Sequence, residues 1–112
     1  GMAKRVLPVV VGSAQPIENY NVDAARELRK NLSTPIIVVG GIRKLEDMER
    51  ILRGGQADAI AMSRPFIREP GLVRKLKANR QNESKCTSCT HCAIAQEANS
   101  LRCYNGTVPA NA

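Results

Sequence analysis

The alternation of short apolar runs with amphipathic stretches constrains the fold of this chain more than any other feature of its sequence. Residues 6–11, 35–39 and 58–62 are strand-like runs of apolar and mostly β-branched side chains. The stretches 22–32 and 45–52 follow the first two runs and have apolar residues at helical spacing, and 69–78 also reads as a helix. Such an order, with short connections, indicates βαβ units and a parallel sheet. The predicted fold class is therefore α/β.

Local signals predict where these elements begin and end. Asn21 is a candidate N-cap for the first helix, Gly54-Gly55 follows the second, and Pro70 suits the first turn of the third. The run at 35–39 is continuously apolar instead of alternating. A continuous run of this kind is typical of a strand that is buried on both faces of a parallel sheet.

The chain divides into two parts of different character. Residues 3–80 hold the strand–helix units, whereas residues 81–112 are polar, lack periodicity and contain every cysteine. We expect the second part to be a loop-rich appendix organised by whatever its cysteines bind. Three strand–helix units neither complete a doubly wound sheet nor close a (β/α)8 barrel. The first part is therefore expected to be a piece of a larger architecture.

Two neighbouring strand ends predict a phosphate site. Gly40-Gly41 follows the strand at 35–39, and Ser63-Arg64 follows the strand at 58–62. In parallel sheets these carboxyl ends lie at one edge, where ligands bind. Bare glycine backbone and a guanidinium both suit a phosphate group. The alternative is structural: a tight glycine turn and a surface arginine. Arg43 is a weaker phosphate candidate.

A longer pattern in residues 35–76 resembles a known family. The segment reads V-G-G-I-R, then L-x-x-G-x-A-D-x-I-A-M-x-R-P, then E-P. It is similar to the last two βα units of the Old Yellow Enzyme family, in the NADH:flavin oxidoreductase branch that includes dienoyl-CoA reductases and trimethylamine dehydrogenase. The resemblance implies a partial TIM barrel that binds FMN at its carboxyl face. It also implies that Gly40, Gly41, Ser63 and Arg64 contact the FMN phosphate, with Ser63 standing where the family usually has glycine.

The catalytic residues that the resemblance implies are missing from this chain. In the family, the flavin-ring contacts, the substrate-anchoring pair and the proton-donating tyrosine come largely from earlier strands. Here the single histidine, His91, lies among the cysteines, and neither tyrosine ends a predicted strand. We expect the C-terminal part of an FMN-dependent NAD(P)H oxidoreductase acting on a small molecule, with no catalytic residue of its own. Its expected partner is a missing N-terminal barrel half or further copies of itself.

Four cysteines follow the pattern C-x2-C-x2-C-x10-C: Cys86, Cys89, Cys92 and Cys103. Thiolates at this spacing suit a [4Fe–4S] cluster or zinc. Disulfides and unliganded thiols are further alternatives, although the absence of a secretion signal favours a cytoplasmic protein, in which disulfides are rare. The resemblance favours the [4Fe–4S] cluster, because the dienoyl-CoA reductase branch has a similar motif. His91 is expected to face solvent.

Charge and composition narrow the remaining function classes. The net charge is +7, and the basic residues are densest between Arg68 and Lys85. A solvated helix face explains this better than a nucleic-acid surface, since the chain has only 2 tyrosines, 1 phenylalanine and no tryptophan for base stacking. No apolar run is long enough to span a membrane. The rival to the flavoenzyme is a small zinc-binding module or a non-catalytic subunit that completes a barrel.

Overall fold

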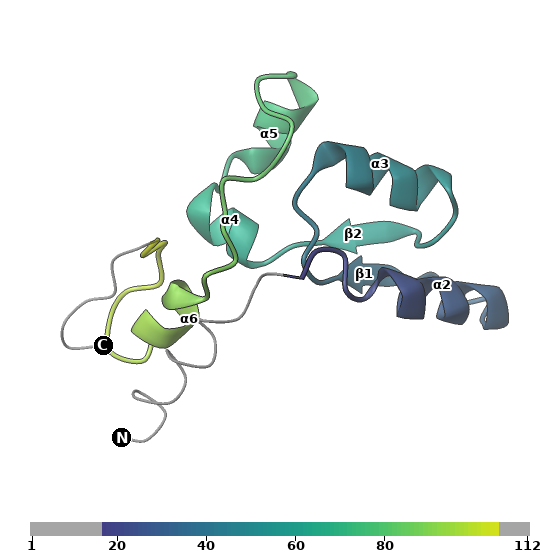
Figure 1. Ribbon diagram of the computed structural model, residues 1–112, viewed down its shortest axis with the longest axis horizontal. Helices are drawn as coiled ribbons and strands as arrows, with labels where there is room; N and C mark the ends of the chain where they lie inside the picture. The colour runs from purple at the N-terminus through teal and green to yellow at the C-terminus, as the bar shows by residue number, and fades with distance from the viewer. Residues whose placement is uncertain (1–16, 106–112) are drawn as a thin grey trace.

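The computed structural model describes residues 17–105 of the 112-residue chain (Figure 1). The expected strand at 6–11 lies outside the described residues. None of the helices in residues 17–105 has the length and apolar character needed to cross a bilayer. The elements are, in chain order, α2 (Val22–Asn31), β1 (Ile37–Val39), α3 (Leu45–Arg53), β2 (Ala59–Ala61), α4 (Arg64–Arg68), α5 (Leu72–Lys77) and α6 (His91–Ala95).

The two strands form a parallel pair, so the predicted α/β class is confirmed at the level of a small parallel sheet. Ile37 is paired with Ala59, and the register continues to Val39 and Ala61. Asp58 fixes the start of this pair, because its Oδ2 accepts a hydrogen bond of 2.8 Å from the Ile36 N–H. Its Oδ1 lies 3.0 Å from the Arg29 guanidinium of α2. The carboxylate therefore joins the helix to both strands.

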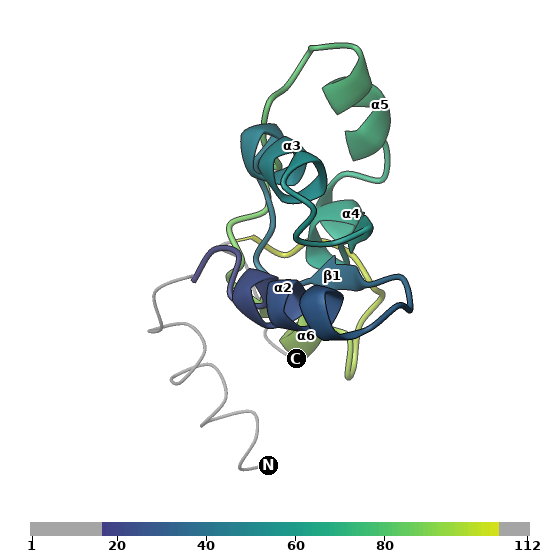
Figure 2. The ribbon, with the colours of Figure 1, turned by 90° about the vertical axis from the view of Figure 1, so that its right-hand side faces the viewer.

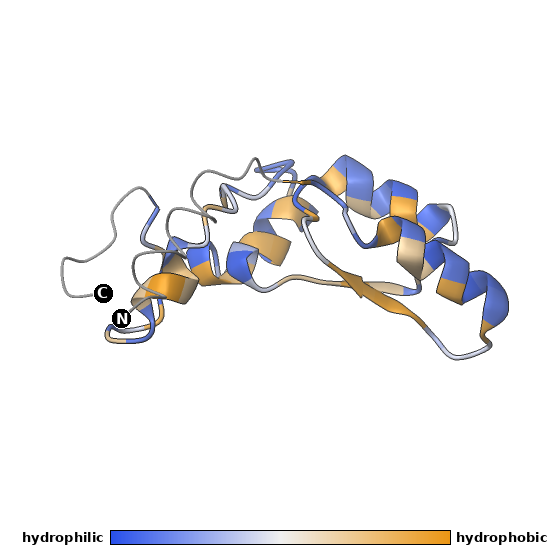
Figure 3. Cartoon of the chain, turned by 60° about the horizontal axis from the view of Figure 1, so that its bottom comes forward, coloured by the Kyte–Doolittle hydropathy of each residue, from blue (hydrophilic) through white to orange (hydrophobic). Residues whose placement is uncertain are grey.

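Helices α2 and α3 cover one side of the sheet, and the core lies between them and the strands (Figure 3). Each helix contributes apolar residues at helical spacing, as predicted, and Val38 is the strand residue that faces them. The buried core cluster consists of Val22, Ala25, Val38, Ile42, Met48, Ile51, Ala57, Leu72 and Leu76.

The prediction that the strand at 35–39 is buried on both faces is wrong for this chain. Val38 is 2% exposed, but its neighbours Ile37 and Val39 are 66% and 49% exposed. Alternate residues of a strand point to opposite faces. Within residues 17–105, no helix packs on the second face, so its side chains meet solvent (Figure 3).

The predicted third helix at 69–78 is also corrected. Within this range the structure has a shorter helix, α5, and a separate helix that the sequence analysis did not predict, α4, lies before it. Glu69, Pro70 and Gly71 separate the two helices. Glu69 has non-helical backbone angles, φ −137° and ψ 82°. Proline disfavours helical backbone angles for the residue that precedes it, so helix α4 ends before Glu69. Pro65 instead occupies the first turn of α4.

The region after α5 contains more order than the sequence indicated. Helix α6 forms within the stretch expected to be loop-rich, and it lies at the opposite end of the molecule from α5 in two perpendicular views (Figures 1 and 2). Between them the chain passes along the start of α3. The Leu45 N–H donates to the Asn82 carbonyl at 2.8 Å, and the Ser84 N–H donates to the Arg43 carbonyl at 2.9 Å. These bonds bring the cysteine-rich segment toward the carboxyl ends of the strands.

Candidate functional site

The four residues predicted to bind phosphate come together in the structure. Gly40, Gly41, Ser63 and Arg64 line one cavity of about 190 Å³. The first two follow β1 and the last two follow β2, and the parallel register places these strand ends beside each other. The predicted adjacency of the two turns is therefore confirmed, whereas their role in cofactor binding remains a prediction.

The glycine turn is shaped by a segment that precedes α2. Gly40 and Gly41 have φ angles of 135° and 68°. A Cβ atom on Gly40 would lie 2.7 Å from the Tyr20 ring, and one on Gly41 would lie 2.5 Å from the Ile17 carbonyl oxygen. Only glycine accommodates both the backbone angles and the close approach of this segment. The packing of this turn therefore requires its two glycines, in addition to their predicted role in binding phosphate.

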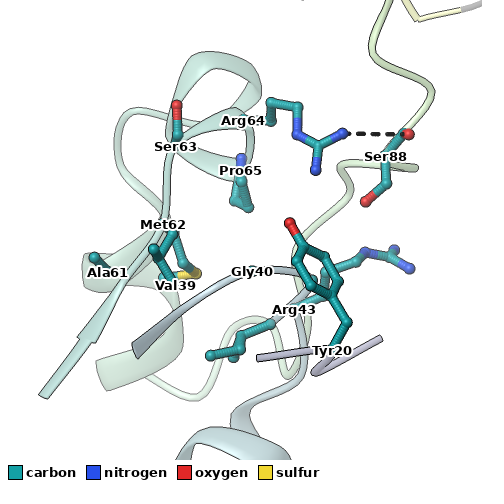
Figure 4. Close-up of a pocket in the computed structure, with 12 residues that line it drawn as sticks. Tyr20, Val39, Gly40, Arg43, Ala61, Met62, Ser63, Arg64, Pro65 and Ser88 are labelled. Carbon is teal, nitrogen blue, oxygen red and sulfur yellow. Dashed lines mark hydrogen bonds between the residues drawn. The ribbon is translucent and has the colours of Figure 1, made fainter. Parts of the chain in front are cut away.

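Tyr20 and Asn21 both lie against Gly40, and Tyr20 also lines the cavity. Asn21 occupies the N-cap position of α2, but its side chain makes no cap hydrogen bond. Its Nδ2 donates instead to the Val39 carbonyl at 2.7 Å, which ties the start of α2 to the end of β1. The Tyr20 ring stands beside Gly40 (Figure 4). The N-cap prediction is therefore right about the position and wrong about the contact.

Two arginines give the cavity its positive charge. Arg64 points toward the cysteine-rich segment, where its Nη1 donates to Thr90 Oγ1 at 2.7 Å and to the Ser88 carbonyl at 3.5 Å (Figure 4). Arg43 donates from Nη2 to the Ser84 carbonyl at 3.1 Å. The Nε of Arg43 is buried and has no hydrogen-bond partner among the described residues. A buried, unpartnered N–H of a guanidinium suits an anionic ligand.

The four cysteines line a second, smaller cavity of about 20 Å³, to which Arg64 and Thr90 also contribute. All four thiols are free, so the disulfide alternative is absent from this structure. The Ser88 N–H donates to Cys86 Sγ at 3.4 Å, and Arg68 Nη1 donates to Cys103 Sγ at 3.3 Å.

The thiols share the cavity without forming a metal-ligand set. In residues 17–105, no three His, Cys, Asp or Glu side chains are arranged so that they could hold a metal ion. Burial raises the pKa of the Cys92 thiol, and the neighbouring Cys86 and Cys89 raise it further, while Arg64 opposes them. His91 does not line the cavity. The residue is half-buried and its Nδ1 is buried, so the expectation that it faces solvent is met only in part.

A buried carboxylate anchors the chain just before the first cysteine. Glu69 is 5% exposed and accepts hydrogen bonds from the Lys85 N–H at 2.7 Å and from Ser84 Oγ at 3.3 Å. Ser84 Oγ accepts in turn from the Cys86 N–H at 3.0 Å. Burial alone would raise the pKa of Glu69, but the hydrogen bonds from Lys85, Gln81 and Lys75 outweigh it and lower the pKa to about 2.

Several residues of this region were not identified from the sequence. They are Tyr20 at the glycine turn, Glu69 and Ser84 before the first cysteine, Ser88 and Thr90 between the cysteines, and Arg68 beside Cys103. The available signals were the polar residues interleaved with the cysteines and the charged Glu69 directly before a proline. Asp47 and Asp58 serve structure, since their carboxylates accept hydrogen bonds from Asn19 Nδ2 and from the Ile36 N–H.

Comparison with known proteins agrees with the resemblance seen in the sequence. An NADH oxidase of Thermoanaerobacter brockii is 37% identical over 84 residues, which are 74% of this chain and 13% of that protein. A 4,4'-dithiodibutanoate disulfide reductase of Rhodococcus erythropolis is 33% identical over 67% of this chain and 18% of its own length. Dimethylamine dehydrogenase of a Hyphomicrobium species is 31% identical over 69% of this chain and 10% of its own length.

More distant similarity extends to another enzyme. The imidazole glycerol phosphate synthase subunit HisF of Thermobifida fusca is 35% identical over 62% of this chain and 26% of that protein. No solved structure matches the chain significantly. The chain spans less than a fifth of the length of the oxidase, the reductase and the dehydrogenase described above. Because the family model matches residues 2–83, across both strand ends that line the larger cavity, the chain belongs to the NADH:flavin oxidoreductase / NADH oxidase family.

Proposed function

We propose that this chain supplies the phosphate end of an FMN site and a thiolate site for a [4Fe–4S] cluster in an FMN-dependent NAD(P)H oxidoreductase. The observation that carries the proposal is the convergence of Gly40, Gly41, Ser63 and Arg64 on one cavity at the carboxyl ends of two parallel strands. Family membership supports the flavin. When bound, FMN would accept and pass on the hydride, and this chain's part is to hold its phosphate.

The cavity fits the phosphate group but not the whole cofactor. Its volume is about 190 Å³, whereas sites for drug-sized ligands usually start at about 300 Å³. Arg64 and Arg43 both line it. The Nε of Arg43 is buried without a hydrogen-bond partner among the described residues, and its Nη1 lies 3.5 Å from the Glu18 carboxylate. A phosphate held by two guanidiniums is favourable. The isoalloxazine ring needs walls that the described residues do not build, so the other parts of the flavin site must come from elsewhere.

The cysteine cavity fits a cluster by the chemistry of its donors. Four thiols line it, and Arg64 and Arg68 lie beside them. A cluster with four thiolate ligands carries net negative charge, which the two guanidiniums would offset. The sulfurs would have to approach one another before they could ligate iron. Their short loop allows this movement, because Cys86, Cys89 and Cys92 are each only three residues apart.

The uncovered sheet face supports a partial barrel. Ile37 and Val39 of β1 are exposed, and the outer edges of β1 and β2 are unpaired among the described residues. In a closed barrel such side chains fill the interior and such edges pair with further strands. We propose that residues 3–80 form the last units of a TIM barrel and that residues 81–112 form its cysteine-rich appendix. The remaining strands would come from a missing N-terminal half or from other copies.

Ligand titration tests the phosphate site. We expect inorganic phosphate to bind the full chain, and FMN to bind more weakly than micromolar, because the flavin ring finds no pocket. Replacing Arg64→Ala should abolish phosphate binding. The matched control is Arg74→Ala on α5, an exposed arginine outside the cavity. Calorimetry and flavin fluorescence measure both ligands. Equal phosphate affinity of the Arg64 variant and the wild type would contradict the assignment, and submicromolar FMN affinity would contradict an incomplete flavin site.

A further inference from the structure

Arg64 lines both cavities. It follows β2 at the phosphate cavity, and it also contributes to the cavity of Cys86, Cys89, Cys92 and Cys103. Both hydrogen bonds that its side chain makes among the described residues go to the loop between the cysteines, at Ser88 and Thr90. The orientation of the guanidinium is therefore set from the cysteine side.

The geometry leaves most of the guanidinium free for an anion. Nη1 makes the bonds to Thr90 Oγ1 at 2.7 Å and to the Ser88 carbonyl at 3.5 Å. A guanidinium has five N–H donors in a fixed plane, so Nε and Nη2 can bind an anion at the same time. The shorter bond, to the Thr90 hydroxyl, is the one that determines the direction of this plane.

Thr90 is itself held in an unusual backbone conformation. Its φ is 65°, and that of Ser88 is 58°. A β-branched residue seldom occupies this left-handed region, and such residues cluster at binding sites. The Thr90 hydroxyl also donates to the Ser88 carbonyl at 3.3 Å, and the Thr90 carbonyl accepts from the Ala93 N–H at 3.1 Å. The hydroxyl that meets Arg64 is thus fixed by the turn that begins α6.

We infer that Thr90, a residue of the cysteine loop, is the positioning residue for the phosphate-binding guanidinium of Arg64, and that the two sites are thereby linked. This inference rests on the proposed phosphate site. Thr90 does not line the phosphate cavity, so its effect on phosphate acts through Arg64. Linkage also works in reverse: phosphate that holds Arg64 stabilises the loop carrying Cys89.

The test compares two threonines in the full chain by calorimetric titration with inorganic phosphate. Thr90→Val keeps the shape of the side chain and removes the acceptor for Arg64. The matched control is Thr87→Val, which lines the same cysteine cavity but whose hydroxyl bonds to Asn105 at 2.9 Å. We expect Thr90→Val to raise the dissociation constant for phosphate about fivefold or more. Thr87→Val should leave it unchanged, and Thr90→Ser, which restores the hydroxyl, should restore the affinity.

The alkylation rate of Cys89 tests whether phosphate binding affects the cysteine loop. Saturating phosphate should slow the alkylation of Cys89 by iodoacetamide in the wild type and leave the rate unchanged in Thr90→Val. If Thr90→Val binds phosphate as tightly as the wild type while Arg64→Ala does not bind it, the positioning role is wrong and the phosphate site stands. If the wild type and Arg64→Ala bind phosphate equally, or neither binds it, the proposed phosphate site itself fails, and the positioning role fails with it.

Discussion

The carboxylate of Glu69 accepts a hydrogen bond of 2.7 Å from the backbone N–H of Lys85. The two residues are 16 positions apart, and the bond holds the start of the cysteine-rich segment against the junction of α4 and α5. Because the same carboxylate also accepts from Ser84, which accepts from Cys86, it fixes the backbone on which the first cysteine stands. Glu69 therefore connects the folding of the α/β part to the geometry of the cysteine cavity.

Replacing Glu69→Gln should destabilise the fold by about 2 kcal/mol, because buried hydrogen bonds to a charged acceptor are lost. Glutamine has a single acceptor oxygen, so its amide nitrogen would face either the donors of Lys85 and Ser84 or those of Lys75 and Gln81, which then lack a partner. Urea unfolding at neutral pH measures the difference. The control is Glu97→Gln, an exposed glutamate in the same part of the chain. Equal destabilisation by both substitutions would show that Glu69 has no special role.

The same carboxylate predicts a dependence of stability on pH. The pKa of Glu69 is about 2 in the folded chain and 4.5 without the surrounding structure. A folded pKa below the unfolded one means that the ionised group stabilises the fold above about pH 4.5. This contribution is lost as the pH falls through about 2. We expect the difference in free energy of unfolding between the wild type and Glu69→Gln to shrink as the pH falls from about 4.5 to about 2. A difference that stays constant with pH would contradict a stabilising role of the ionised Glu69 carboxylate.

The glycine turn predicts a contrast between two substitutions. Gly41 and Gly55 have nearly equal φ angles, 68° and 67°, but a Cβ on Gly41 meets a carbonyl oxygen at 2.5 Å, whereas one on Gly55 meets nothing within 4 Å. Gly55→Ala should lower the free energy of unfolding by about 1–2 kcal/mol, because alanine disfavours the left-handed backbone conformation. Gly41→Ala should lower it clearly more, because the segment that contains Ile17 must also move. Thermal unfolding compares the two, and equal melting temperatures would show that the close approach is not maintained in solution.

The cysteine cavity predicts iron in protein prepared without air. Elemental analysis should find iron and sulfide, and EPR after reduction should show the cluster. Cys103→Ser should lose the iron and lower the melting temperature, since metal binding and local folding are linked. His91→Ala should retain the iron, because His91 does not line the cavity. Stoichiometric zinc without iron in such a preparation would instead support the zinc alternative.

The uncovered face of the sheet predicts self-association of the isolated chain. Ile37 is 66% exposed and Val39 is 49% exposed, next to the free edge of β1. Burying such apolar surface at about 25 cal/mol per Å² favours association. Light scattering across a dilution series should show oligomers, and Ile37→Lys should weaken them. Leu101→Lys, at a site that is 61% exposed and outside the sheet, is the control. A sharply melting monomer at micromolar concentration would contradict the partial-barrel proposal.

The sequence by itself determined the elements whose signals are local. Helix α3 begins where the apolar spacing starts at Leu45, and the parallel pairing of β1 with β2 follows from the strand–helix–strand order. The same order places Gly40-Gly41 next to Ser63-Arg64. The family could also be recognised from the motif in residues 35–76. Its residues include ones that the backbone requires, such as Gly41 with its positive φ. The helix depends on local spacing, and the pairing of the strands and of their ends follows from the order of the elements.

Only the tertiary structure decided which distant residues meet. The contact of Arg64 with Thr90 spans 26 positions, and that of Glu69 with Ser84 spans 15. The expected third helix begins at Leu72 and not at Glu69, whose buried carboxylate makes such a contact. A hydrogen bond between remote side chains depends on how whole elements pack, and residue spacing along the chain does not encode that direction. The sequence therefore predicted the two sites separately, and the fold placed Arg64 at both of the cavities that their residues line.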